Sequence, residues 1–162
     1  MFAFARALVW AALFVAFGLV FIPSRVLEWT GVTPPAAIGP AQILGSLLVL
    51  AGGILVLACL FVFAFAGHGT AAPFDPPRRL VAQGPYACVR NPIYIGAIVA
   101  MAGAALFYRS LGVLCYALVL ALIFAVLVLT YEEPTLRRLF GAEYDAYCRR
   151  VPRWLPALRR DV

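Results

Sequence analysis

The chain has 162 residues, of which 65% are apolar and only 12% are charged, whereas soluble proteins average roughly 45–50% and 25%. A soluble domain of this size would leave most of that apolar excess facing water, and a disordered chain needs the opposite balance, so both classes are excluded in favour of a protein that resides in a bilayer. The net charge of +6 does not indicate a nucleic-acid partner, because no basic stripe with interleaved aromatic residues lies outside the apolar stretches.

Four long stretches without charged residues follow one another along the chain, at residues 7–24, 41–66, 91–108 and 110–131. Each is close to the roughly 20 residues that a helix needs to cross about 30 Å of hydrocarbon. In lipid only helices and closed barrels satisfy the backbone, and the alternation typical of a barrel is absent. No small-residue cleavage pattern follows the first stretch, so we expect it to be retained. The sequence therefore predicts an all-α, polytopic membrane protein with about four transmembrane helices.

The arginines predict the orientation of these spans. If the N-terminus is cytoplasmic and the chain crosses four times, Arg25 and Arg109 lie outside and the other eleven of the thirteen basic residues lie inside. This distribution agrees with the positive-inside rule, so we expect both termini to be cytoplasmic. All basic residues are arginine, and with the heavy alanine and leucine usage this is typical of a GC-rich bacterial genome. The expected location is the bacterial cytoplasmic membrane.

The first cytoplasmic loop is rich in proline and glycine, which favours a shaped, non-helical segment before residue 91. Loops of this length are commonly functional. His68, the only histidine, stands at the end of the second span and is interpreted most simply as an interfacial cap. The chain has no cluster of metal-ligand residues and no C-x-x-C pair, so we expect no metal site.

The third span begins with a helix-start signal. Asn91 suits the N-cap position and Pro92 the first helical position. A helix N-terminus beside Arg90 is also suited to binding an anion. Gly96 begins a row of small residues at every fourth position, which we interpret first as a close helix–helix contact.

The fourth span ends in two adjacent carboxylates, Glu132 and Glu133. Ionised groups at the hydrocarbon boundary are costly and are usually partnered. Two interpretations stay open from the residues alone: pairing with an arginine (Arg90, Arg137 or Arg138), or recognition of a polar, hydroxyl-bearing or cationic ligand.

A further helix is predicted from Pro134 onward. Apolar residues recur at helical spacing from 136 to 151, and arginines occupy the opposite side. This pattern predicts one C-terminal amphipathic helix that lies at the interface of the inner leaflet.

The ordered set of motifs resembles the integral-membrane methyltransferases, a group that includes isoprenylcysteine carboxyl methyltransferases and phospholipid N-methyltransferases. The resemblance covers roughly residues 67–156 and looks like a bacterial branch of the group. It differs at position 91, where the family motif has His; Asn keeps a hydrogen-bonding group but does not titrate near neutrality. The matching residues are Gly84-Pro85-Tyr86, Arg90-Asn91-Pro92-Ile93-Tyr94-Ile95-Gly96, Glu132-Glu133, Leu136, Phe140-Gly141, Tyr144, Tyr147 and Val151-Pro152-Arg153.

The resemblance implies methyl transfer from S-adenosylmethionine to a lipophilic acceptor at the cytoplasmic membrane face, with S-adenosylhomocysteine as product. It divides the chain into two helices (residues 1–66) and a methyltransferase-like core (residues 67–162). The residues expected near the acceptor or the chemistry are His68, Arg137 and Tyr144. Those expected to bind the cofactor are Arg90, Asn91, Pro92, Tyr94, Gly96, Tyr131, Glu132 and Glu133.

Two other functions stay open at this point: an NADPH-dependent membrane reductase related to sterol reductases, which shares part of the motif, and a non-enzymatic membrane scaffold. The methyl acceptor is also undecided: an isoprenoid acid, a lipid amine and a hydrophobic thiol are all consistent with the sequence. Gly45, Gly52 and Gly53 would allow the second helix to contact a neighbouring helix closely.

Overall fold

The computed structural model describes residues 12–63 and 79–156, and every regular element in those ranges is a helix. This confirms the predicted all-α class. The elements are a π-helix η1 (Phe14–Phe21), α2 (Ile22–Trp29), α3 (Pro40–Val62), a short 3₁₀ turn η3 (Gly84–Ala87), α4 (Pro92–Tyr108), α5 (Leu111–Leu127), a π turn η4 (Val128–Glu132), α6 (Glu133–Phe140) and α7 (Ala142–Arg150).

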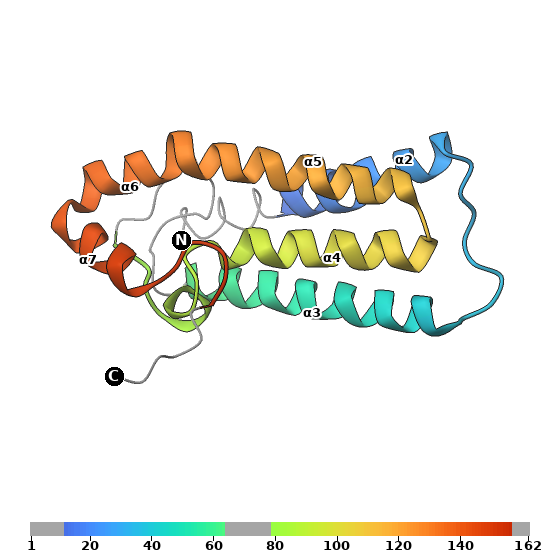
Figure 1. Cartoon of the computed structure of the whole chain (residues 1–162), viewed down its shortest axis with the longest axis horizontal. Helices are drawn as coiled ribbons and strands as arrows, with labels where there is room; N and C mark the ends of the chain where they lie inside the picture. The colour runs from blue at the N-terminus through green and yellow to red at the C-terminus, as the bar shows by residue number, and fades with distance from the viewer. Residues whose placement is uncertain (1–11, 64–78, 157–162) are drawn as a thin grey trace.

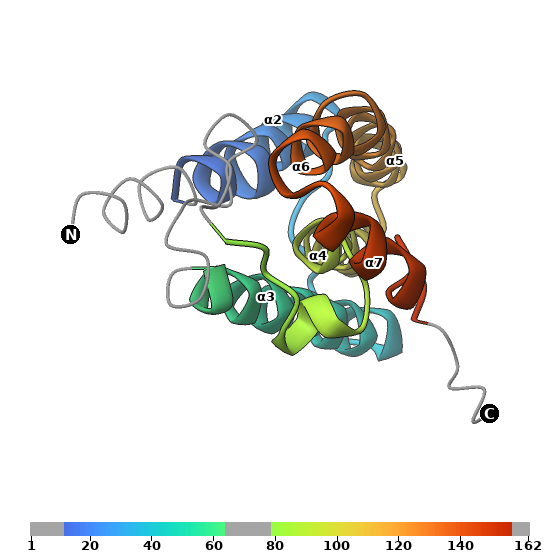
Figure 2. The same ribbon diagram turned by 90° about the vertical axis from the view of Figure 1, so that its left-hand side faces the viewer.

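The long helices form an antiparallel bundle in which α4 lies between α3 and α5 (Figures 1 and 2). The helix η1–α2 packs beside α5. The connections at residues 30–39 and 109–110 lie at one end of the bundle, whereas η3, α6 and α7 lie at the other (Figure 1). The short helices η3, α6 and α7 therefore lie at the same end of the bundle as the start of α4.

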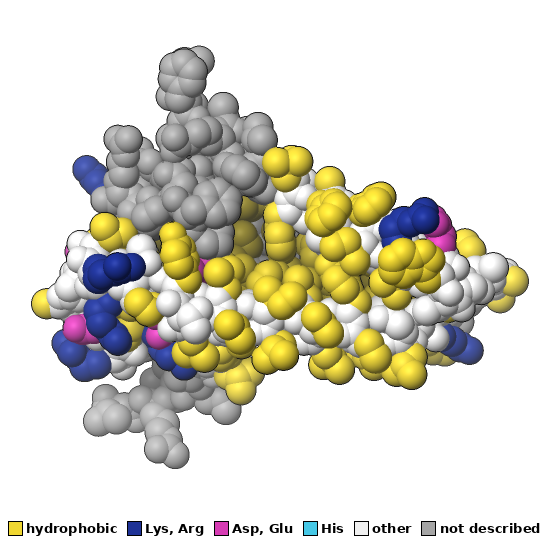
Figure 3. Space-filling model, turned by 90° about the horizontal axis from the view of Figure 1, so that it is seen from above, with side chains coloured by type: hydrophobic (Ala, Val, Ile, Leu, Met, Phe, Trp, Pro, Cys, Tyr) yellow, Lys and Arg dark blue, Asp and Glu magenta, His cyan; other side chains and the backbone are white. Residues whose placement is uncertain are grey.

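Two helices in the described part of the chain are long and apolar enough to cross a membrane: Pro40–Val62 and the continuous helix Leu111–Phe140. Only 22% and 28% of their most apolar stretches are buried, so most of their apolar side chains face outward, unlike those of a core helix in a soluble protein. Pro92–Tyr108 is apolar but shorter. Figure 3 shows the same pattern on one face, where apolar side chains occupy the middle and charged ones lie toward the two ends.

The contact between α3 and α4 is made by glycines. A Cβ atom at Gly45 would lie 2.7 Å from the carbonyl oxygen of Gly103, and one at Gly96 would lie 2.8 Å from that of Gly52. The two backbones therefore touch, which confirms the packing interpretation of Gly96. The close neighbour predicted for Gly45 and Gly52 is α4 of the same chain, whereas Gly53 faces open space among the described residues.

A buried amide fixes the register of this pair at the far end of the bundle. Gln42 donates from Nε2 to the carbonyl oxygen of Phe107 (3.1 Å) and accepts from the backbone N–H of Gly39 (3.1 Å). The chain then turns through Arg109 in the left-handed region (φ 51°), and Ser110 caps α5. The amide of Gln42 thus links the N-terminal end of α3 to the C-terminal end of α4 and opposes sliding of one helix along the other.

The region after the fourth predicted span differs from its prediction. The expected interfacial helix from Pro134 is two helices, and the first, α6, continues the membrane helix without a break. The π turn accommodates Pro134, which has no N–H to donate and would crowd the preceding turn of a regular α-helix. The chain breaks later, at Gly141, whose positive φ of 50° ends α6 before α7 begins.

We predict that Gly45→Ala lowers the thermal unfolding midpoint of the detergent-purified protein. The added methyl would meet the backbone of α4, and overpacking of this kind costs about 1–3 kcal/mol. Gly53→Ala is the matched control because it makes the same change on the same helix in open space. Equal midpoints for the two variants would contradict the close α3–α4 contact.

Candidate functional site

The candidate site lies at the end of the bundle where α4 begins. A small cluster of buried aromatic and apolar residues, the outer aromatic core, packs on its outer side. Tyr144, Tyr147 and Val151 are buried together and pack against Leu80, Leu136, Phe140 and Cys148. The hydroxyl of Tyr147 donates to the carbonyl oxygen of Tyr86 in η3 (2.7 Å). This core fixes α7 and the following segment against α6 and the loop before α4.

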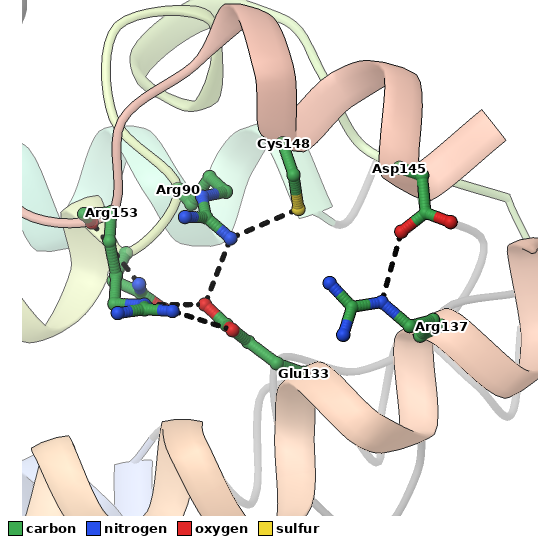
Figure 4. Close-up of polar contacts among 7 residues, drawn as sticks. Arg90, Glu133, Arg137, Asp145, Cys148 and Arg153 are labelled. Carbon is green, nitrogen blue, oxygen red and sulfur yellow. Dashed lines mark hydrogen bonds and ion pairs between the residues drawn. The ribbon is translucent and has the colours of Figure 1, made fainter. Parts of the chain in front are cut away.

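Glu133 lies at the centre of the polar contacts (Figure 4). Its Oε1 accepts from Nη1 of Arg90 (2.9 Å) and from Nε of Arg153 (2.7 Å), and its Oε2 accepts from Nη2 of Arg153 (2.9 Å). Glu133 is buried, and two-point pairs of this kind are the strongest carboxylate–guanidinium contacts. Its side chain therefore joins the start of α6 to the residue before α4 and to the tail. Of the arginines proposed as partners, Arg90 is confirmed.

The tail after α7 is also tied to the start of α4 through its backbone. The N–H of Arg90 donates to the carbonyl oxygen of Pro152 (2.9 Å), and Nδ2 of Asn91 donates to that of Arg153 (3.2 Å). Asn91 stands at the N-cap position as predicted, but its side chain makes no capping hydrogen bond. Its amide instead satisfies a tail carbonyl, which explains why Asn91 is buried.

Glu132 points to a different partner. The hydroxyl of Tyr94 donates to its Oε1, and the ring of Tyr94 stacks on Phe124 with centroids 4.4 Å apart. Within the described residues Glu132 contacts no basic side chain. Successive helical residues project about 100° apart, so the two adjacent carboxylates face different groups.

These contacts leave two neighbouring positions with opposite net charge. Arg90 and Arg153 share the single carboxylate of Glu133, so this group of three side chains has a net charge of one positive. The carboxylate of Glu132 is hydrogen-bonded to the neutral side chain of Tyr94, so its negative charge has no basic partner among the described residues. Nη1 of Arg90 also contacts Sγ of Cys148 (3.0 Å), and its Nε is buried without a hydrogen-bond partner among the described residues. A buried guanidinium N–H without a hydrogen-bond acceptor is costly, and the excess positive charge here favours an anionic acceptor.

The ionisation of the outer groups supports this charge assignment. Burial raises the pKa of Tyr147 to about 12 and raises the pKa of Tyr144 above its usual range. The hydrogen bond to Glu133 raises the pKa of Arg153. At neutral pH the tyrosines therefore stay neutral and Arg153 stays charged.

The structure brings together six of the residues predicted to form the site: Arg90, Asn91, Tyr94, Glu132, Glu133 and Tyr144. Of the other five, one adjoins this cluster, three lie apart from it and one lies outside the described ranges. Pro92 begins α4, Gly96 packs on α3, Tyr131 is exposed, Arg137 pairs at the surface with Asp145 (2.9 Å), and His68 lies outside the described residues.

Two residues of the cluster were not predicted as site residues. Arg153 belonged to the matching Val-Pro-Arg motif, so its place in that motif was a usable signal. Cys148 carried no signal beyond its position on the apolar side of a predicted helix. Within the described ranges, no three His, Cys, Asp or Glu side chains are grouped so that they could hold a metal ion.

Comparison with known families gives one match. The model of the phospholipid methyltransferase family matches residues 40–143, which is well over half of the chain and spans α3 through the start of α7. Searches of curated proteins and of solved structures found no match.

We predict that Tyr147→Phe lowers the free energy of unfolding by about 1–3 kcal/mol, because it leaves the buried carbonyl of Tyr86 without its donor. Tyr131→Phe is the matched control, since it removes the same atom from an exposed side chain. Chemical unfolding in detergent, followed by tyrosine and tryptophan fluorescence, measures both. Equal losses in the two variants would show that the Tyr147–Tyr86 bond does not fix α7.

Proposed function

This chain belongs to the phospholipid methyltransferase family, and on that basis we propose that it transfers a methyl group from S-adenosylmethionine to a lipophilic acceptor at the cytoplasmic face of the membrane. Membership of the family implies a membrane methyltransferase. The identity of the methyl donor and the cytoplasmic location are the proposal, and they rest on the charges and the position of the described site.

The observation that carries the proposal is the pair of opposite charges on neighbouring elements. S-adenosylmethionine carries an amino-acid carboxylate, an ammonium and a sulfonium. The excess positive charge at Arg90, whose buried Nε has no hydrogen-bond partner in the described part of the chain, suits the carboxylate. The carboxylate of Glu132 suits the ammonium or the ribose hydroxyls, so the residues present fit this cofactor.

The remaining site residues take supporting roles in this proposal. The N-terminus of α4 at Pro92 adds a favourable dipole for the cofactor carboxylate. Tyr94 orients Glu132 through its hydrogen bond, and the exposed ring of Tyr131 is available to a sulfonium. Tyr144 is fully buried near Arg90 and shapes the outer wall.

The cofactor, when bound, supplies an electrophilic methyl group. The chain contributes orientation and the exclusion of water, which supply much of the rate when the acceptor is already a carboxylate or thiolate. The acceptor would approach from the bilayer, since the apolar side chains of α3 and α5 face outward beside the site. An isoprenoid acid, a lipid amine and a hydrophobic thiol all meet this requirement.

The arginines support a cytoplasmic site. Arg25 and Arg109 belong to the opposite end of the bundle, whereas the other described arginines lie in the loop before α4, in α6, in α7 and in the tail. Positive residues concentrate on the cytoplasmic side of membrane proteins, which is also the side from which a polar cofactor enters.

We predict micromolar binding of S-adenosylhomocysteine to the detergent-purified protein, measured by calorimetric titration. Arg90→Ala should weaken binding at least about tenfold, or about 1.4 kcal/mol, because it removes the buried donor that suits the carboxylate. Arg138→Ala is the matched control, since Arg138 is exposed and contacts only the nearby Thr135 among the described residues. The thermal unfolding midpoint of each variant establishes that it is folded.

No binding of S-adenosylhomocysteine at millimolar concentration to folded wild-type protein would overturn the proposal. A parallel titration with NADPH tests the reductase alternative, for which binding of NADPH alone would be the supporting result.

A further inference from the structure

The segment that follows α7 has no regular secondary structure and crosses the start of α4. Residues 151–154 are called the strap below. Three polar contacts fix it: Arg90 N–H to Pro152, Asn91 to the carbonyl of Arg153, and the side chain of Arg153 to Glu133. Figure 4 shows the guanidinium of Arg153 beside Glu133, on the side away from Cys148.

Apolar contacts hold both ends of the strap. Val151 is buried in the outer aromatic core with Tyr144 and Tyr147. Trp154 packs against the bundle core that contains Tyr94 and Phe124. The strap therefore connects the two cores across the residues that form the candidate site.

Arg153 controls how much of Glu133 is available to Arg90. The two-point contact of Arg153 uses both carboxylate oxygens of Glu133, and Arg90 reaches only Oε1, through a single nitrogen. Without Arg153, the carboxylate could turn and form its own two-point pair with Arg90. That pair would use both terminal nitrogens of Arg90, of which Nη1 already bonds Glu133, and would neutralise its charge.

We propose that Arg153 and Asn91 are positioning residues of the methyl-transfer site: by fixing the strap they limit Glu133 to a single contact with Nη1 of Arg90, and they keep the excess positive charge of Arg90 available to an anionic group of the ligand. This inference rests on the proposed function, in which the anionic group is the cofactor carboxylate. Arg153 acts through Glu133 and touches no reacting atom.

Cys148 offers a readout of the strap that does not depend on activity. Its thiol is half-buried, contacts Nη1 of Arg90 and packs against the core that includes Val151. Cys88 is exposed and serves as the internal reference in the same molecule. Release of the strap should therefore raise the alkylation rate of Cys148 relative to that of Cys88.

The experiment measures N-ethylmaleimide labelling of both cysteines by mass spectrometry, and S-adenosylhomocysteine affinity by calorimetry, on the same full-length preparations. For Arg153→Ala we expect the Cys148:Cys88 rate ratio to rise about tenfold, as for local opening, and the affinity to fall about tenfold. Arg150→Ala is the matched control: Arg150 is exposed on α7 and its described contact is one weak bond to the backbone of Ala146 (3.4 Å).

Arg153→Lys keeps the charge without the planar fork, so we expect it to lie between wild type and Arg153→Ala in both measurements; this milder change also covers the case in which Arg153→Ala fails to fold. Asn91→Ala should shift both measurements in the same direction. An unchanged Cys148:Cys88 ratio in the Arg153 variants would overturn the strap. A raised ratio with unchanged affinity would overturn the positioning role.

Failure of the proposed function is a separate result. If folded wild-type protein does not bind S-adenosylhomocysteine, the methyl-transfer assignment fails and the positioning role fails with it. The labelling ratio still decides whether Arg153 holds the strap.

Discussion

The shared carboxylate of Glu133 is the interaction on which the arrangement of the site depends. It joins three segments that are distant in the sequence: the residue before α4, the start of α6 and the tail after α7. Removing one partner of a buried ion pair typically costs about 3–5 kcal/mol, because the other charge stays buried without compensation. The same constraint sets the charges of the site. Two guanidiniums meet one carboxylate here, which leaves an excess positive charge at Arg90 beside the separate carboxylate of Glu132. The proposed zwitterionic cofactor rests on this pair of charges.

The rest of the fold keeps these groups in place. Glycine contacts let α3 and α4 touch along their backbones, and Gln42 fixes their register at the far end, so the position of α4 against α3 is set. On the other side of the site, the π turn lets the membrane helix pass Pro134 and continue into α6. Glu132 and Glu133 lie at the end of this turn, one facing Tyr94 and the other Arg90. Such irregular turns are frequent at functional sites, and here the turn sets the directions of both acids.

Composition and helical periodicity were sufficient to predict the helical class and the gathering of polar residues at one end of the bundle. A bilayer requires long apolar helices, so charged residues are confined to the segments between and after them. The separate roles of Glu132 and Glu133 could not be predicted, since adjacent identical residues carry no directional signal until the helix geometry is known. The continuation of the span through Pro134 was missed for a similar reason: proline signals a helix start, and the compensating π turn leaves no clear mark in the sequence. The sequence indicated Arg153 only as part of the Val-Pro-Arg motif. Its partner Glu133 is 20 residues earlier, and the two side chains come into contact only because the chain changes direction at Gly141.

The proposed roles of the two adjacent carboxylates differ: Glu132 binds the ligand, and Glu133 holds three segments of the site together. This difference is tested most directly by comparing Glu132→Gln with Glu133→Gln in two measurements on each protein, the affinity for S-adenosylhomocysteine and the thermal unfolding midpoint. Glutamine keeps the size of glutamate and one accepting oxygen, but it removes the charge and replaces the other oxygen with an NH2 donor. We predict that Glu132→Gln weakens binding about tenfold or more with little change in midpoint, whereas Glu133→Gln lowers the midpoint clearly. The same pattern of losses in both variants would contradict the division of roles.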